Sequence, residues 1–317
     1  MNTSLASLPV IDVLCIGGVN LDRKLKAFQP LHAGSSNACV ASESPGGVAR
    51  NVAENLARLG LQVSLLSHVG RDAAAHTVLA PLRELGVDTD SCLVSETGST
   101  GSYTAVLDAQ GQLSIGMADM ALIELLSPEL IAPVLEAKSF KLWMADMNLP
   151  ACSLVWLGEL AHAKEQRLVM LAVSEPKMKR LPADLRGVDT LVLNRGELAA
   201  LAQHLDWQHE PINVKAAFFQ LHAAGLQRLV VTLGEHGAAC IEAGHAHEIR
   251  LKPETSEAFT IVDVSGAGDA FCSGLCASYL RYPSDALAQH VQRAMRLGQL
   301  TVQSPHTVSH AITTDLI

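Results

Sequence analysis

The residues best suited to chemistry lie in one short loop, which reads DVSGAGD over residues 263–269 and precedes an apolar run, residues 270–280. Gly266, Ala267 and Gly268 carry little or no side chain, so their backbone N–H groups can converge on an anion. A helix that begins here would add the positive potential of its N-terminus. The loop therefore predicts an anion hole for a transferring phosphoryl group.

Asp269 follows the three small residues, at the mouth of the expected anion hole. A carboxylate there can accept the proton of an attacking hydroxyl while backbone amides hold the charge of the γ-phosphate. Taken alone, the loop also permits a simple tight turn in which Asp269 only caps the following helix. Because further motifs accompany it, we expect Asp269 to be the general base.

Polar side chains follow two glycine pairs nearer the N-terminus. An early strand ends at residues 17–18 and leads to Asn20 and Asp22, whereas Gly46-Gly47 precedes Asn51 on the first turn of an expected helix. Ligands of open α/β sheets bind outside the carboxyl ends of the strands. We therefore expect Asn20, Asp22 and Asn51 to hydrogen-bond hydroxyls of a polyol. Turn formation and helix capping explain each residue equally well when it is taken singly.

Two later motifs suit nucleotide phosphates and a metal. Asn194 and Glu197 follow one expected strand, and Thr232, Gly234 and Gly237 follow another. Glu197 could orient Mg²⁺ through water, because Mg²⁺ keeps several waters and leans on one or two carboxylates. The glycines would let the backbone approach ATP. A surface glutamate and an ordinary hairpin are the simpler interpretation of these residues by themselves.

The elements that must position these residues alternate between β-branched runs and runs of helical period. Expected strands are residues 12–16, 63–67, 142–145, 168–173, 190–193 and 228–232, each of the last four followed by a helical pattern, with earlier helices at 51–59 and 72–85. This alternation predicts βαβ units and a mostly parallel sheet. We expect one three-layer α/β/α, doubly wound domain over residues 1–317. Segments 21–44 and 91–117 alternate in polarity instead and predict a small β lid.

Composition excludes several classes of partner. The 317 residues carry 23 Lys and Arg against 32 Asp and Glu, a net charge of −9, with no basic cluster for nucleic acid or an anionic membrane. No apolar run is long enough to span a membrane, and residues 1–9 lack a signal-peptide pattern. The seven cysteines form no C-x-x-C pair. We expect a cytoplasmic protein with a small-molecule ligand.

These four motifs, in this order and spacing, resemble the ribokinase-like (PfkB) family of sugar and nucleoside kinases over nearly the whole chain. Both family signatures are present, the first at residues 46–60 and the second at residues 263–274, where Val264-Ser265 replaces the common Thr-Thr or Pro-Thr. The resemblance implies ATP and Mg²⁺ as cofactors, Asp269 as the base and residues 266–268 as the anion hole.

The same resemblance implies roles for the remaining motif residues. Its sugar contacts are Asp22, Gly47 and Asn51, its phosphate and magnesium network is Asn194 with Glu197, and its nucleotide site includes Thr232 and Gly234. Many members also bind a monovalent cation, for which the matching positions here are Asp263, Ser265 and Ser309, so the resemblance adds an optional K⁺.

Within the family, residues 98–108, 117–120, 146–149 and 174–176 most resemble the pseudouridine kinases. That resemblance implies phosphorylation of the 5′-hydroxyl of pseudouridine. Met117 and Asn148 could flank its uracil-like ring, although methionines at such spacing are more often plain core.

Several alternatives share part of this pattern. A ribokinase, an adenosine or inosine kinase or another sugar kinase would carry the same motifs, and a non-catalytic sugar- or nucleoside-binding regulatory protein would keep the fold. The absence of G-x-x-x-x-G-K-[ST], and of G-x-G-x-x-G after the first strand, argues against Walker-type kinases and Rossmann dehydrogenases.

A lid of a few strands leaves open edges that a second copy could cover, so we expect a homodimer.

Overall fold

The main sheet has eight strands in the order β14-β13-β12-β11-β10-β9-β1-β4. The computed structural model describes residues 10–207, 213–253 and 260–317. The strands are β1 (Val10–Ile16), β4 (Val63–Leu66), β9 (Ser139–Asp146), β10 (Leu168–Leu171), β11 (Thr190–Asn194), β12 (Arg228–Thr232), β13 (Ala238–Glu242) and β14 (Ile249–Leu251). Neighbours from β4 to β12 pair in parallel, and β13 and β14 add an antiparallel edge.

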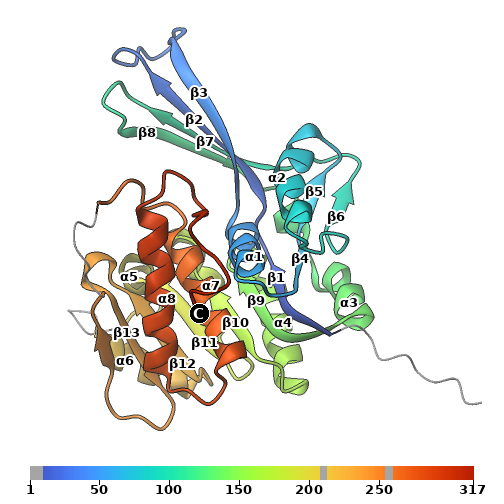
Figure 1. The fold of residues 1–317 in the computed structure, drawn as a ribbon, viewed down its shortest axis with the longest axis vertical. Helices are drawn as coiled ribbons and strands as arrows, with labels where there is room; N and C mark the ends of the chain where they lie inside the picture. The colour runs from blue at the N-terminus through green and yellow to red at the C-terminus, as the bar shows by residue number, and fades with distance from the viewer. Residues whose placement is uncertain (1–9, 208–212, 254–259) are drawn as a thin grey trace, which may run out of the picture.

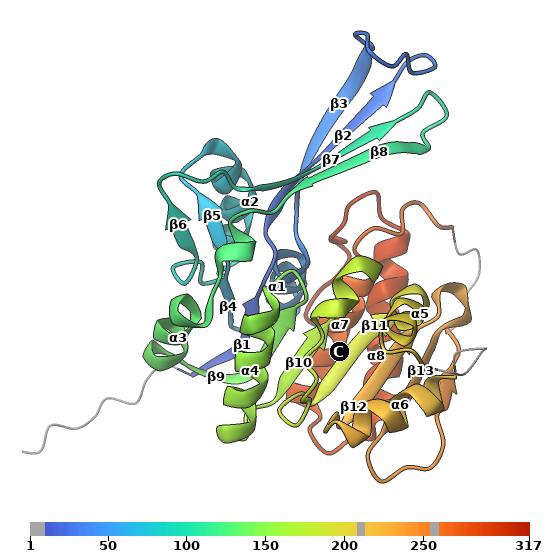
Figure 2. The same cartoon turned by 180° about the vertical axis from the view of Figure 1, so that it is seen from behind.

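Both faces of this sheet are buried, because its central strands are continuous apolar runs. Val13 and Cys15 of β1 belong to one hydrophobic cluster, whereas Leu14 and Ile16 belong to the other. One face is covered by α1 (Val48–Arg58), α2 (Ala73–Glu84), α7 (Ala267–Arg281) and α8 (Leu287–Val302). The other is covered by α3 (Pro128–Ala137), α4 (Ala151–Ala163), α5 (Arg195–His204) and α6 (Val214–Ala223). The three-layer, doubly wound prediction is confirmed (Figures 1 and 2).

A second sheet projects from the body of the molecule (Figure 1). Its strands are β2 (Asn20–Ala27), β3 (Cys39–Gly46), β7 (Gly101–Leu107) and β8 (Leu113–Asp119), in the order β3-β2-β7-β8. These strands come from the two segments whose polarity alternates in sequence. We call this sheet the lid. The expected segment 91–117 also contains β6 (Leu93–Ser95), which pairs with β5 (His68–Gly70) in a separate two-stranded sheet and is not part of the lid.

Two of the helices expected after strands are not formed. β10 is followed by the short 3₁₀ helix η2 (Glu175–Arg180), whose first turn contains Pro176. β12 leads through η3 (Gly234–His236) into the antiparallel strand β13. The reason for the hairpin is local, because Gly234 and Gly237 adopt positive φ angles of 61° and 87°, which an α-helix cannot accommodate. A third short helix, η1 (Ile123–Leu125), precedes α3.

Among the described residues, no helix is both long and apolar enough to cross a membrane. Residues 1–9, in which the sequence shows no signal-peptide pattern, lie outside the described residues.

Candidate active site

The loop with the most small residues leads directly into α7, which begins at Ala267. Gly266 precedes the helix in a left-handed conformation, with φ of 76°. The N–H of Ala267 donates to the carbonyl of Val264 at 3.3 Å, so that donor is engaged in the turn. The N–H groups of Gly268 and Asp269 lie in the first turn of α7, where backbone N–H groups have no partner within the helix. The amides of Gly268 and Asp269 are therefore candidate donors to an anion, whereas the N–H of Ala267 is used within the turn.

Asp269 is held in place from the neighbouring helix α1. The amide Nδ2 of Asn51 donates to Asp269 Oδ2 at 2.8 Å, although the two residues are 218 positions apart. The other side of that amide is fixed by Arg50, whose guanidinium donates to Asn51 Oδ1 at 3.2 Å and pairs with Glu54 at 2.6 Å. Asn51 is therefore buried in a single orientation, with its donor directed at the candidate base.

The surroundings of Asp269 favour its protonated form. Burial raises the pKa of the Asp269 carboxyl to about 7, the hydrogen bond from Asn51 opposes that shift, and the negative charges of Asp146, Asp22 and Glu197 add to it. A carboxyl that titrates near neutral pH can both accept and release a proton under working conditions.

The expected sugar-side residues meet where the lid joins the body. Asn20 pairs with Gly46 across β2 and β3, and its Nδ2 donates to Asp22 Oδ1 at 2.5 Å. A Cβ at Gly46 would lie 2.2 Å from Asp22 Oδ2, and one at Gly47 would lie 2.4 Å from the carbonyl oxygen of Gly18. The glycine pair thus lets polar groups and backbone crowd together at this strand end.

Asp146 is a buried carboxylate that our sequence reasoning did not single out. It ends β9 with no exposed surface, and its Oδ2 accepts the backbone N–H groups of Gly18 and Ala49, both at 2.8 Å. Its Oδ1 accepts the N–H of Asn148 at 2.8 Å. One side chain therefore ties together three segments of the expected sugar site. The available signal was an acidic residue that directly follows the apolar run at residues 142–145.

Lys177 was also missed. It lies in η2, and its Nζ donates to the side-chain oxygen of Asn148. An ammonium can only donate, so this contact fixes the orientation of the Asn148 amide and leaves Nδ2 on the side of Gly18. Burial lowers the pKa of Lys177, and the charge of Asp146 opposes that shift. The usable signal was a lysine soon after the Ser174-Glu175-Pro176 segment.

The residues expected at the nucleotide meet at the ends of two adjacent strands. Asn194 of β11 pairs in register with Thr232 of β12, and the turn with Gly234 and Gly237 follows. Asn194 and Glu197 form a capping box, in which each side chain accepts the other's backbone N–H, at 2.9 and 2.8 Å. Our sequence reasoning did not consider this capping role, and Glu197 is only 5% exposed, so it is not the surface glutamate of the simpler interpretation. The capping role does not preclude a second role.

The surroundings of Glu197 suit Mg²⁺. Burial raises the pKa of Glu197, the Asn194 N–H opposes the shift, and the charge of Glu175 adds to it. Only one Glu197 oxygen accepts the Asn194 N–H. Within the described residues no group of three or more His, Cys, Asp or Glu forms a metal cage. Mg²⁺ bound mainly by phosphates and water needs no such cage, so the buried carboxylate fits it.

The structure does not bring Met117 to this site. Met117 pairs with Thr104 in the lid, and Thr104 pairs with Arg23, whereas Asp22 is paired with Tyr103. Because adjacent residues of a strand point to opposite faces, Met117 lies on the face away from Asp22. Its side chain is 66% exposed. In a single chain, Met117 therefore does not lie beside the expected substrate site, and the prediction that it flanks the substrate was wrong.

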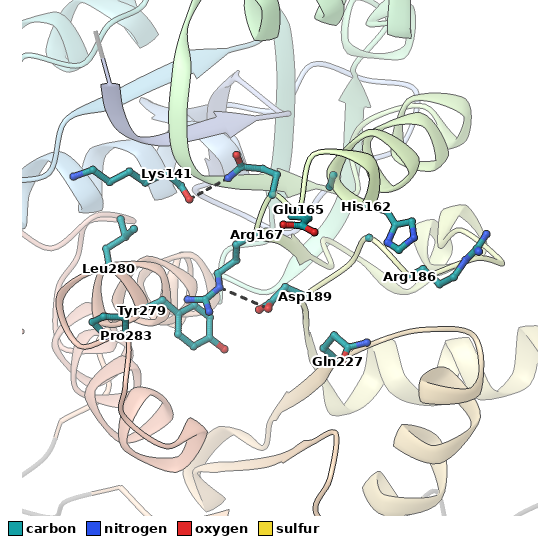
Figure 3. Close-up of a pocket in the computed structure, with 13 residues that line it drawn as sticks. Lys141, His162, Glu165, Arg167, Arg186, Asp189, Gln227, Tyr279, Leu280 and Pro283 are labelled. Atoms are coloured by element: carbon teal, nitrogen blue, oxygen red, sulfur yellow. Dashed lines mark hydrogen bonds and ion pairs between the residues drawn. The ribbon is translucent and has the colours of Figure 1, made fainter. Parts of the chain in front are cut away.

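A cavity of about 640 Å³ lies at the opposite, amino-terminal edge of the main sheet (Figure 3). Its three lysine and arginine side chains already have carboxylate partners: Lys141 pairs with Asp12 at 2.7 Å, Arg167 with Asp189 at 3.6 Å, and Arg186 with Asp184 at 2.5 Å. The cavity therefore offers no uncompensated charge for a phosphate and is not the candidate active site.

Comparisons with known proteins agree with this geometry. A sequence model described as pfkB family carbohydrate kinase matches residues 10–314. A pseudouridine kinase of Escherichia coli (strain K12) is 31% identical over 273 residues, covering 84% of this chain and 83% of that protein. A carbohydrate kinase from Agrobacterium tumefaciens matches with a TM-score of 0.81 and 30% identity, covering 96% of this chain and 95% of that one. An Arabidopsis thaliana ribokinase complexed with ribose and ATP has a TM-score of 0.81 at 17% identity, covering 97% of both chains.

The fold and these relatives define a phosphotransferase that uses an alcohol group as its acceptor. The chain belongs to the pfkB family of carbohydrate kinases, so it is a sugar or nucleoside kinase. The expected ribokinase-like fold and family membership are both confirmed.

Proposed function

We propose that this chain transfers the γ-phosphoryl group of ATP to the 5′-hydroxyl of pseudouridine, giving pseudouridine 5′-phosphate and ADP. The observation that carries the kinase chemistry is the carboxylate of Asp269, oriented by Asn51 at 2.8 Å on the first turn of α7. The choice of acceptor is supported by the 31% identity to a pseudouridine kinase over 84% of the chain. The choice of donor is supported by the ATP named in the Arabidopsis ribokinase complex.

In this mechanism Asp269 accepts the proton of the substrate's 5′-hydroxyl. As it does so, the hydroxyl oxygen attacks the γ-phosphorus in line with the departing ADP oxygen. The first-turn amides of Gly268 and Asp269 hold the charge that develops on the phosphoryl oxygens. Asn194, Thr232 and the glycine turn at 234–237 contact the nucleotide. Bound Mg²⁺ would neutralise the phosphate charge, and Glu197 would hold it through water.

Asn148 and Lys177 together decide which hydrogen-bonding group the site presents to the nucleoside, a donor or an acceptor. Because Lys177 occupies the Asn148 oxygen, the Asn148 Nδ2 donor is the group presented toward Gly18 and the sugar site. A substrate atom that meets this amide must be an acceptor, which suits a carbonyl of a uracil ring.

The acceptor is tested by measuring ADP release from ATP and Mg²⁺ with pseudouridine, uridine, adenosine, inosine, ribose and fructose. Strong turnover of pseudouridine alone is the expected result. Turnover of another member of the panel would keep the kinase and replace the acceptor. Silence across the panel would contradict the proposed acceptor and favour a binding protein or an untested alcohol.

Lys177→Met should raise the KM for the nucleoside roughly tenfold while leaving the KM for ATP within about twofold, since one charge-assisted hydrogen bond is lost. Without the ammonium the Asn148 amide is free to rotate, so its donor no longer faces the substrate. Lys179→Met is the matched control, because Lys179 is an exposed lysine two positions away on the same short helix. Equal KM changes for both substrates would show that Lys177 does not act through Asn148.

We also propose a homodimer joined through the lids. By strand register Leu25, Val106 and Ile115 lie on the same lid face, which is also the face of Met117 and points away from Asp22. Ile115 and Met117 are 55% and 66% exposed, a large apolar exposure for a lone sheet. Sedimentation equilibrium should give twice the chain mass, and Met117→Glu should lower that mass toward one chain.

A further inference from the structure

An ion pair joins the lid to the loop that forms the anion hole. Lys24 Nζ lies 3.1 Å from Asp263 Oδ2, although the two residues are 239 positions apart in sequence. Lys24 is in the middle of β2, on the face that also carries Asn20 and Asp22. Asp263 opens the loop that ends at Asp269. This contact therefore links a lid strand to the catalytic loop directly.

Asp263 also shapes the loop itself. Its Oδ1 accepts the backbone N–H of Ser265 at 2.8 Å, which closes the turn before Gly266. The same stretch is attached to the end of α8, because the N–H of Val262 donates at 2.8 Å to the carbonyl of Val302, the last residue of that helix. One carboxylate thus holds the turn with one oxygen and the lid lysine with the other. A disturbance at Asp263 would reach the amides of Gly268 and Asp269 through this turn.

The residues present do not fit the K⁺ site that the family resemblance implies. Both Asp263 oxygens already accept an N–H donor, and the donor to Oδ2 is the charged ammonium group of Lys24, which would repel a K⁺ ion bound to the same carboxylate. The hydroxyl of Ser309, which is 3% exposed, accepts the N–H of Ala311 at 3.3 Å. A cation bound at Asp263 would have to displace Lys24 or lie beside a like charge, which is unfavourable.

We propose that Lys24 is a positioning residue that supplies, from the lid, the positive charge at Asp263, so that this kinase works without K⁺. The ammonium group and K⁺ are both compact monovalent cations, so one can stand for the other at a carboxylate. Because the ammonium is attached to β2, the charge reaches Asp263 only when the lid lies over the site. The order of the anion-hole loop is thereby coupled to the position of the lid. This inference concerns the kinase activity whatever its acceptor.

The test measures turnover with the acceptor that the panel identifies, in potassium chloride and in tetramethylammonium chloride at equal ionic strength. The native protein should turn over equally in both salts. Lys24→Met should lose roughly twofold to fivefold in tetramethylammonium, as expected for a partly exposed ion pair, and recover in K⁺. Lys26→Met, which changes the next residue on the same lid face, should behave like the native protein in both salts.

A second measurement does not depend on activity. K⁺ should raise the thermal unfolding temperature of Lys24→Met relative to tetramethylammonium, because it binds the vacated carboxylate, and should leave the native protein unchanged. Lys24→Arg keeps the charge and should stay independent of K⁺. Strong activation of the native protein by K⁺ would overturn the proposal. Equal turnover of Lys24→Met in the two salts, whether normal or lost, would overturn it as well, since K⁺ would then not replace the ammonium.

Discussion

Replacement of Asp269 by Asn is expected to lower turnover roughly 10²- to 10⁴-fold while nucleoside binding is largely retained, because the general base is lost and the shape is kept. The carbonyl of an asparagine can still accept the hydrogen bond from Asn51 Nδ2 that Asp269 Oδ2 accepts at 2.8 Å. It cannot accept the proton of the attacking hydroxyl. The measurement pairs steady-state turnover with the nucleoside dissociation constant from calorimetry. In Asp269→Asn the turnover should fall while the affinity for the nucleoside changes little.

Asp119→Asn is the control for this substitution. Asp119 is an exposed carboxylate at the end of lid strand β8, so its loss should leave turnover within about twofold, as for an ordinary surface change. Near-normal turnover of Asp269→Asn would remove Asp269 from the role of base. A parallel loss of turnover and binding would instead assign it to substrate contact.

The pH dependence of the native protein provides an independent check of the same role. Since burial and the neighbouring carboxylates raise the pKa of Asp269 to about 7, and only its ionised form accepts a proton, kcat/KM should level off above pH 7. Below pH 7 it should fall by about tenfold per unit. Asp269→Asn should lose this inflection along with most of its activity.

The raised pKa also sets the sign of a stability effect. Asp269 binds its proton more tightly in the folded chain than in the unfolded chain, where its pKa returns to the ordinary value of 3.8. Its contribution to stability is therefore largest below pH 3.8 and is lost as the pH rises to about 7. Asp269→Asn, which carries no charge, should unfold at a higher temperature than the native protein at pH 8. This difference should be smaller at pH 5.

The main sheet was predictable because its central strands are continuous apolar runs in the sequence. Leu168 to Leu171 and Leu191 to Leu193 have no polar side to place in water, so burial on both faces was the consistent interpretation. The lid strands were readable for the opposite reason, since alternation implies one polar face. What alternation does not say is which face meets the site. Met117 was misplaced for this reason, because its direction depends on pairing across β7 and β8.

The candidate site was predictable where small residues and polar residues adjoin in sequence. Asn51 and Asp269 follow glycine-rich turns, and the structure places them 2.8 Å apart. Contacts between distant segments left no such mark. Lys177 meets Asn148 across two strand ends, and Lys24 meets Asp263 only because the lid folds over the body. A lone lysine in a polar stretch has many possible partners, and only the folded chain selects one.

Gly266→Ala is expected to reduce turnover roughly 10²-fold or more, the loss that follows when an anion-hole donor is misplaced. Gly266 has a φ of 76°, and a Cβ there would lie 2.0 Å from the carbonyl oxygen of Thr307. Either the loop or the segment after α8 must move. Because Gly266 immediately precedes α7, movement of the loop shifts the amides of Gly268 and Asp269 away from the phosphoryl group. The KM for ATP should rise with the fall in turnover.

Gly86→Ala separates this effect from backbone strain. Gly86 also has a positive φ, 81°, but it follows α2 and a Cβ there would meet nothing within 4 Å. It should lose about 1 kcal/mol of unfolding free energy, the cost of a left-handed alanine, and keep its turnover. Chemical denaturation and turnover are measured on both variants. If Gly266→Ala lost only the same stability and kept its turnover, the loop before α7 would not hold the transferring phosphoryl group. A turnover loss confined to Gly266→Ala would follow from the position of the first-turn amides.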